Sequence, residues 1–277
     1  MVTPTKGKNM SSTKQFKRWR VWGLGLGAIA ALTIVGCSSN DDSKPTGTAA
    51  TEIAATEAVP LPQGDEPVKL DPAEFTTEID NPWWPMTPGS RWVYRETDTA
   101  GGEERVVVEV TDETKTIANG VEARVVRDTV TENSEPVEVT DDWYAQDPDG
   151  NVWYLGEATA EYTNGKVSSR AGSFEAGVDG AQAGVAMPGD PQPGMSYRQE
   201  YYKGEAEDEG AVITRGQEQV QVPFGYYRKG VVMTRDLVPT EPKVQELKFY
   251  APGIGPVLSV HTDGLGGRAE LVSYRPG

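Results

Sequence analysis

The sequence predicts an all-β protein whose antiparallel sheets form a sandwich or an open half-barrel. From about Asp71 onward, short runs of β-branched and aromatic residues alternate with clusters of Gly, Pro, Asn and Asp. These clusters include hairpin-type turns at Asn119-Gly120 and Asn164-Gly165. The gaps between runs are too short for crossover helices, so neighbouring strands are expected to be antiparallel. No segment of this region shows the apolar stripe of a helix.

The predicted strands cover residues 90–95, 104–110, 121–131, 137–145, 152–157, 196–202, 211–214, 226–237, 243–250, 256–262 and 269–274. Several alternate between apolar and polar side chains, which is typical of a sheet with one buried and one solvated face. In the segment 243–250, this alternation predicts that Leu247 and Phe249 are buried and that Glu246 and Lys248 face water.

The domain also resembles itself at an offset of about 105 residues. Four pairs of segments match in the same order: "TPGSRWVY" (87–94) with "QPGMSYRQ" (192–199), "VVRDTV" (125–130) with "MTRDLV" (233–238), Trp143-Tyr144 with Phe249-Tyr250, and Val152 with Val257. We expect two duplicated halves, about 87–171 and 192–277, within one domain at 71–277. Chance reuse of Pro-Gly turns and aromatic pairs is the alternative.

The chain begins with a predicted secretory signal at residues 1–36. Its first 20 residues carry six basic side chains and no acid, and an apolar run of 15 residues follows at 21–35. This run is shorter than the roughly 20 residues that a membrane-spanning helix needs. The segment Ile34-Val35-Gly36-Cys37 resembles a bacterial lipobox. That resemblance implies a lipid on Cys37, which becomes the new N-terminus, whereas a stray thiol after an ordinary signal is the alternative.

Acylation of Cys37 would use the only thiol of the chain, so the mature protein would have no disulfide and no cysteine nucleophile. Residues 37–70 are rich in Ser, Thr, Ala, Pro and acids, and are predicted to form a disordered tether. We therefore expect the protein in the cell envelope, lipid-anchored to a membrane on its extracytoplasmic side.

The charge of the mature chain argues against a nucleic-acid partner. Loss of six basic residues with the signal leaves 20 basic and 42 acidic residues, so the formal charge changes from −16 to −22. Such a surface repels nucleic acid and anionic headgroups. The predicted membrane contact is consequently the lipid on Cys37.

Four segments resemble an uncharacterised family of lipobox-bearing bacterial envelope lipoproteins: "DNPWWPMTPGSRWVY" (80–94), "DDWYAQDPDGNVWYLGE" (141–157), "FEAGVDGAQAGVAMPGDPQPGMSYRQEY" (174–201) and "KFYAPGIGPV" (248–257). Family members carry an Asn-Pro-aromatic-aromatic-Pro element before the first strand and a terminal Tyr-Ala-Pro-Gly-x-Gly turn. The resemblance covers most of residues 75–275. It implies a lipid-anchored β-domain and does not point to any particular activity.

Two adjacent tryptophans, Trp83 and Trp84, stand between the prolines of this element. The prolines predict an extended segment, in which neighbouring side chains point to opposite sides. We expect one ring to plug the core and the other to cover its rim, with ligand binding by the outward ring as the alternative. The candidate ligand-binding residues are Trp83, Trp84, Trp143, Trp153 and Met187.

A calcium site is the metal alternative for the segment Asp147-Pro148-Asp149-Gly150-Asn151. Asp147, Asp149 and Asn151 place oxygen ligands at alternate positions, as the first half of a calcium loop does. However, a strand containing Trp153 follows directly, and a hairpin tip has the same composition. We prefer the hairpin and expect no other cofactor.

Catalytic patterns are weak. The only histidine, His261, lies beside a predicted turn, and the chain has no G-x-S-x-G elbow. Acid pairs occur at Asp141-Asp142 and in "EAEDE" (205–209), but a glycosidase needs two carboxyl groups facing across a cleft. We expect no enzyme activity.

The segment 172–194 is long and shows no strand pattern, so a flap over a hydrophobic cleft and a linker between the halves are equally open. The prediction for the whole chain is a non-enzymatic, membrane-anchored envelope lipoprotein that binds an apolar or carbohydrate ligand or an envelope protein. A carboxylate- or calcium-assisted hydrolase and a passive structural or interaction module are the alternatives.

The substitution Cys37→Ser tests the predicted anchor, because only the thiol can accept the lipid. The wild-type chain is expected in the membrane fraction with the mass of an acylated, N-terminal Cys37. The Cys37→Ser chain is expected to lack the acyl mass, whereas the neighbouring substitution Ser38→Ala is expected to retain it. Mass spectrometry of both fractions checks this, and an unmodified Cys37 in full-length cytosolic protein contradicts it.

Overall fold

The computed structural model describes residues 60–239, 242, 245–262 and 267–277. The predicted signal, Cys37 and most of the predicted tether lie outside the described residues. Within them the regular structure is β-strand apart from one 3-10 turn, Pro72–Glu74. No helix in these ranges has the length and apolar character of a membrane span. The predicted all-β class is confirmed.

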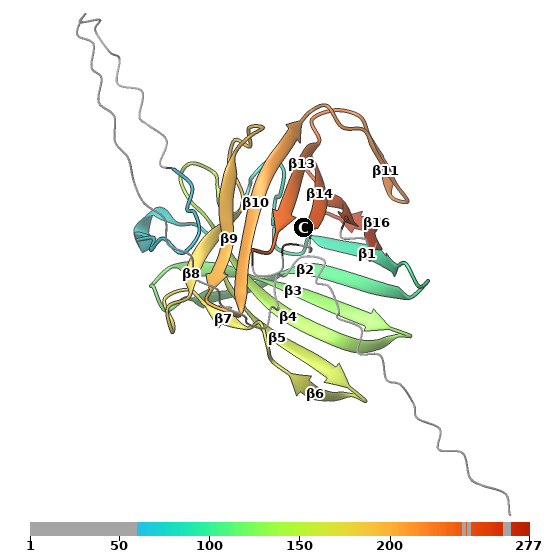
Figure 1. Ribbon diagram of the computed structural model, residues 1–277, viewed down its shortest axis with the longest axis horizontal. Helices are drawn as coiled ribbons and strands as arrows, with labels where there is room; N and C mark the ends of the chain where they lie inside the picture. Colours follow the sequence, from blue (N-terminus) through green and yellow to red (C-terminus); the bar gives the residue numbers. More distant parts are fainter. Residues whose placement is uncertain (1–59, 240–241, 243–244, 263–266) are drawn as a thin grey trace, which may run out of the picture.

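The strands, in chain order, are β1 (Arg91–Asp98), β2 (Glu103–Thr116), β3 (Glu122–Glu132), β4 (Glu135–Gln146), β5 (Val152–Thr163), β6 (Lys166–Ser169), β7 (Phe174–Glu175), β8 (Gln182–Met187), β9 (Ser196–Tyr202), β10 (Ala206–Arg215), β11 (Val220–Val222), β12 (Gly225–Tyr227), β13 (Val232–Leu237), β14 (Gln245–Ala251), β15 (Gly255–His261) and β16 (Gly267–Arg275). Every pairing between them is antiparallel. β11 and β12 form a separate hairpin beside the main sheet (Figure 1).

Twelve strands close into a barrel in the order β4-β3-β2-β1-β16-β15-β14-β13-β10-β9-β8-β5, with β5 pairing back to β4. The expected sandwich or open half-barrel therefore differs in detail from the closed ring. Closure follows from two seams: the last strand, β16, pairs with the first, β1, and β5 pairs with β4 on one edge and β8 on the other.

The first predicted half contributes the barrel strands β1 to β5, and the second contributes β9, β10, β13, β14, β15 and β16. The strand β8 lies between the two sets at one seam, and β16 pairs with β1 at the other. The duplication itself stays a prediction.

The segment 172–194 forms part of the barrel wall and is neither a flap nor a linker, because it contains β7 and the barrel strand β8. The prediction that it lacks strands is wrong. β8 approaches β9 so closely that a Cβ atom at Gly184 would lie 2.1 Å from the carbonyl oxygen of Gln199. Small residues make this approach feasible, and they also hide the β-branched pattern that marks strands in sequence.

The predicted tether, residues 37–70, ends too late in the chain, because its last ten residues or so are packed against the barrel. Residues Leu61, Val68 and Leu70 pack against the core. The buried guanidinium group of Arg198 donates hydrogen bonds to the carbonyl oxygens of Gly64 (2.9 Å) and Glu66 (2.7 Å). The chain is thus fixed to the outside of β8 and β9 from about residue 61 onward.

Residues 79–86, here called the plug, close one end of the barrel. The backbone N–H of Met86 donates to the carbonyl oxygen of Ile79 (2.9 Å), so the plug doubles back on itself. Its tip is a turn in which the side-chain oxygen of Asn81 accepts the N–H groups of Trp83 (2.9 Å) and Trp84 (3.1 Å). The predicted extended conformation is therefore wrong, because Asn81 stabilises a turn.

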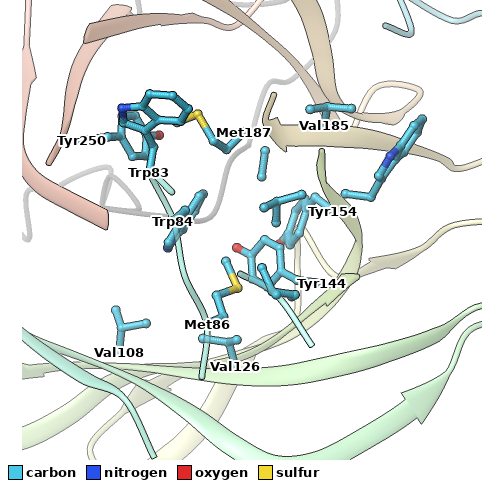
Figure 2. Close-up of a cluster of buried hydrophobic side chains, with 14 of the residues drawn as sticks. Trp83, Trp84, Met86, Val108, Val126, Tyr144, Tyr154, Val185, Met187 and Tyr250 are labelled. Atoms are coloured by element: carbon cyan, nitrogen blue, oxygen red, sulfur yellow. The ribbon is translucent and has the colours of Figure 1, made fainter. Parts of the chain in front are cut away.

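Both tryptophan rings of the plug are buried (Figure 2), with Trp83 9% and Trp84 7% exposed. The Trp84 ring packs between Tyr144 and Tyr250, at centroid distances of 5.6 and 5.8 Å. Nε1 of Trp83 donates to the carbonyl oxygen of Gly230 (3.0 Å). The plug therefore joins strands from both predicted halves.

The substitution Trp84→Ala is expected to lower the free energy of unfolding by about 3–5 kcal/mol, because it leaves a cavity between two tyrosine rings. The control Tyr226→Ala removes a ring that is 47% exposed and is expected to change stability by less than about 1 kcal/mol. Urea unfolding measures both values. Equal losses in the two variants would refute the role of the plug.

Candidate functional site

Beyond the plug, the barrel interior is lined by carboxyl groups. The inward-facing acidic residues are Glu96, Glu104, Asp128, Glu138, Asp142, Glu157, Glu161, Glu200, Asp208, Asp236 and Glu246. Burial raises the pKa of Glu96 on β1 well above its usual range, and Glu246 on β14 and Asp128 on β3 add to this rise. These strands are not neighbours in the ring, so their side chains share one interior.

On the strands that carry them, the interior acids lie farther from the plug than the buried apolar residues do. On β1 the inward side chains are Trp92, Tyr94 and Glu96, in that order, and the last one faces Glu104 across β2. Glu138 and Glu161 form the equivalent cross-strand pair on β4 and β5. These four glutamates are half-buried and form the rim of the interior.

The alternation on β14 has the opposite sense from the predicted one. Glu246 and Lys248 are buried, at 6% and 3% exposure, whereas Leu247 and Phe249 are half-buried on the outside. The strand does alternate, but its polar face points inward. Lys248 thereby places a positive charge among the interior carboxylates.

Lys248 lies at the centre of a buried ion-pair cluster. Its Nζ is 2.7 Å from Oδ2 of Asp236 and 3.3 Å from Oε2 of Glu246. Burial lowers the pKa of Lys248, but the two carboxylates outweigh it and hold this pKa well above its usual value. The ammonium group therefore stays charged.

Glu246 is the titrating member of this cluster. Burial raises its pKa from 4.5 to about 7, against the opposing charge of Lys248. Nε2 of His261 lies 3.8 Å from its Oε1. The Glu246 carboxyl group consequently changes charge near neutral pH.

The hydroxyl group of Tyr154 bridges two more acids. It lies 2.8 Å from Oδ1 of Asp142 and 2.7 Å from Oε2 of Glu157. It has one hydrogen and can donate to only one of them at a time. Asp142 and Glu157 are thus held close together at a single hydroxyl group.

Asp208 differs from these acids, because neither of its buried oxygens has a hydrogen-bond partner among the described residues. It faces Glu200 across β9 and β10. Burial raises its pKa well above the usual range; Lys248 opposes this rise, while Asp236 and Glu246 add to it. An unbonded, buried carboxyl group is costly unless something neutralises it.

A small cavity separates the plug from the acidic interior. It is lined by Trp84, Tyr144, Tyr154, Ala186, Gln199, Lys248 and Tyr250, and has room for about one or two water molecules. It therefore combines aromatic faces with the amide of Gln199 and the ammonium group of Lys248.

The five predicted ligand-binding residues do not form one site. Trp83, Trp84 and Met187 are buried at the plug, whereas Trp143 and Trp153 lie on the outer face of the wall. Nζ of Lys115 lies 4.0 Å from the ring centroid of Trp143, and Phe75 packs edge-on against Trp153. Each of the five rings or side chains serves in packing.

The predicted calcium ligands hold a hairpin together. Oδ1 and Oδ2 of Asp147 each accept a hydrogen bond of 2.8 Å from Asn151, and Oδ2 also accepts one of 2.7 Å from Nε1 of Trp153. Oδ1 of Asn151 accepts the N–H of Gly189 (2.8 Å). Among the described residues, no three Asp, Glu, His or Cys side chains are arranged to hold a metal ion. This geometry favours the hairpin for Asp147, Asp149 and Asn151.

The substitution Glu246→Gln is expected to weaken the pH dependence of stability. The folded chain binds this proton more tightly than the unfolded chain, so the contribution is complete below about pH 4.5 and is lost as the pH rises through 7. For this group alone the loss is about 3 kcal/mol. Urea unfolding at steps between pH 4.5 and 7.5 measures it, with the exposed Glu132→Gln as control. A Glu246→Gln curve parallel to the wild type would contradict the assignment.

No protein-family model and no curated protein matches the chain. Two solved structures are similar to it. A "putative lipoprotein" from Parabacteroides distasonis ATCC 8503 is 14% identical, with 70% of this chain and 98% of that chain covered and a TM-score of 0.37. A β-barrel-like protein of the domain of unknown function DUF1849 from Brucella abortus is 14% identical, with 67% and 96% covered and a TM-score of 0.33. These scores are too low to carry an argument about this chain.

Proposed function

We propose that this chain is an exported, lipid-anchored, non-enzymatic protein of the bacterial cell envelope, whose barrel holds a small positively charged ligand in its acidic interior. The lipobox-like segment ending at Cys37 supports the address. One observation carries the ligand class: carboxyl groups from opposite walls share an interior in which Lys248 is buried with them.

A cation suits this interior better than the apolar or carbohydrate ligand expected from the sequence. The tryptophans that suggested such a ligand are buried in packing positions. The half-buried glutamates of the rim create a negative potential at the end of the barrel away from the plug, which attracts cations. Entry from the rim would lead a ligand toward Asp208 and the cavity.

The contacts that the interior acids make favour ligand binding over hydrolysis. Asp142 and Glu157 contact the same tyrosine hydroxyl group, which leaves no place between them for a glycosidic bond. Asp236 and Glu246 are held by Lys248. These pairs stabilise charge in the interior instead of facing each other across a cleft.

The full-length protein is expected to bind a cation saturably in calorimetric titrations with 1,4-diaminobutane, CaCl2 or MgCl2, and not to bind glucose. Glu138→Gln is expected to weaken binding about fivefold, because it removes about 1 kcal/mol of attraction at the rim. The exposed Glu132→Gln is the control. Binding of glucose alone, or of none of the four, contradicts the proposal.

An interaction module is the second candidate function. The hairpin of β11 and β12 lies beside the barrel (Figure 1) and exposes Phe224 (40%) and Tyr226 (47%). The Phe224 ring packs edge-on against Tyr274 of β16. Exposed aromatic residues of this kind favour a protein contact. This candidate gains support if the cation titrations fail while a Phe224→Ser/Tyr226→Ser variant loses a crosslink that the wild type forms in the envelope.

A further inference from the structure

We infer that Lys248 and Asp236 become covalently joined in the folded barrel, through an amide bond between Nζ of the lysine and the side-chain carboxyl carbon of the aspartate. The inference goes beyond the proposed function and does not depend on any ligand. Its starting point is the distance of 2.7 Å between Nζ of Lys248 and Oδ2 of Asp236, in a pair whose side chains are 4% and 3% exposed.

The register of the sheet brings one amine and two carboxyl groups to the same point of the interior. Asp236 of β13 pairs directly with Glu246 of β14, and Lys248 lies two residues farther along β14. All three side chains are therefore on the same, buried face of the sheet. Oε2 of Glu246 is 3.3 Å from Nζ of Lys248. The fold thus holds a nucleophile, a carboxyl carbon and a proton carrier together.

The reaction is a condensation that needs no further reactant. A proton passes from Nζ of Lys248 to the carboxylate of Asp236, and the nitrogen lone pair then attacks the carboxyl carbon. The C–N bond forms and one C–O bond breaks. Glu246 in its protonated form donates to the departing oxygen and takes a second proton from the nitrogen, so it ends as it began. The products are a secondary amide and one water molecule.

The proton on Lys248 is the main barrier to attack, because an ammonium group has no free lone pair. Burial lowers the pKa of Lys248, but the two carboxylates hold it well above its usual value, so the neutral amine is the minor form. Proton transfer inside the pair, however, converts two buried charges into two neutral groups, which burial favours. We therefore expect a slow reaction that follows folding.

Glu246 is able to supply the proton that the second step needs. Burial raises the pKa of this group to about 7, against the opposing charge of Lys248. At neutral pH a large share of the Glu246 carboxyl group is therefore protonated while it lies in contact with the attacking nitrogen.

The surroundings of the pair favour the amide. Lys248 borders the small cavity, whose aromatic lining consists of Trp84, Tyr144, Tyr154 and Tyr250. This cavity has room for the water molecule that the reaction releases. Reactants held in contact behave as if present at about 10⁵–10⁸ M, which offsets the cost of condensation. The bond removes one positive and one negative charge, so the net charge of the interior is unchanged.

A second close ion pair serves as the matched control. Nζ of Lys115 also lies 2.7 Å from a carboxylate oxygen, Oε2 of Glu175, but the two side chains are 32% and 24% exposed. Water stabilises both charges at such a place, so the neutral pair that the reaction requires is not favoured. We expect no bond between Lys115 and Glu175.

The test uses the full-length chain, which is folded, incubated, unfolded in urea and digested with trypsin. An unlinked chain gives the peptides 236–243 and 244–248. Because trypsin does not cut after an acylated lysine, the linked chain gives 236–243 joined to 244–268, lighter by one water molecule than their sum. Fragmentation in the mass spectrometer places the bond, which distinguishes it from loss of water at an Asp-Gly sequence such as Asp149-Gly150.

Three variants define the reaction. Lys248→Arg keeps the charge but removes the nucleophile, and is expected to give only linear peptides. Glu246→Gln is expected to slow bond formation about 100-fold or more after refolding, because the amide cannot carry the proton. Lys115→Arg is expected to give the branched peptide in full. If Lys248→Arg does not fold, the placement of the bond in the wild type remains decisive.

Only linear peptides from the folded, incubated wild type would mean that the three groups form an ion-pair cluster alone, and would overturn the inference. A branched peptide from a chain kept in urea throughout would overturn it too, because the bond would not depend on the fold. Bond formation at the wild-type rate in Glu246→Gln would overturn the role of Glu246. The cation titrations are a separate measurement, so the proposed function stands or fails independently.

Discussion

A ring of twelve strands encloses more space than its own apolar side chains can fill, and the rest of the structure follows from that constraint. Eight strands already leave an interior just wide enough for side chains, and larger rings leave a lumen. This chain fills one end with the plug, whose Trp84 packs between Tyr144 and Tyr250 from opposite walls. It fills the remainder with long polar side chains, above all Lys248 and its carboxylate partners. The wide ring thus accounts for both an inserted plug and a charged interior.

A charged interior is tolerable only if its charges are compensated. Burying an ion costs several kcal/mol, and the cost is recovered only with close partners. Lys248 with Asp236 meets this condition, and the hydroxyl group of Tyr154 contacts both Asp142 and Glu157. The acids of the interior outnumber Lys248, and the proposed function starts from this excess of carboxyl groups.

The sequence was sufficient for the class of fold, the antiparallel connections and most strands, because turn residues and β-branched runs report local preferences. It was not sufficient for β8, whose small residues reflect the approach of β9 at Gly184, or for the turn that Asn81 stabilises in the plug. The sequence also predicted, wrongly, that Glu246 and Lys248 face water. Alternation shows that the two faces of a strand differ, but it does not show which face is enclosed. One signal of the site was present in the repeat: "VVRDTV" and "MTRDLV" each place an acid, Asp128 and Asp236, within a strand instead of at a turn.

The plug also constrains how the chain can fold. It precedes β1, yet its Trp83 donates a hydrogen bond to Gly230, 147 residues away. Trp92 of β1 likewise donates one to Ile254, 162 residues away. Arg198 likewise fixes Gly64, at a separation of 134 residues. Contacts of this range form late, because the entropy of closing such loops must be overcome first. The plug therefore cannot complete its packing until β14, which carries Tyr250, is available to the Trp84 ring. The topology that seals the barrel thus makes the segment before the first strand depend on strands near the end of the chain.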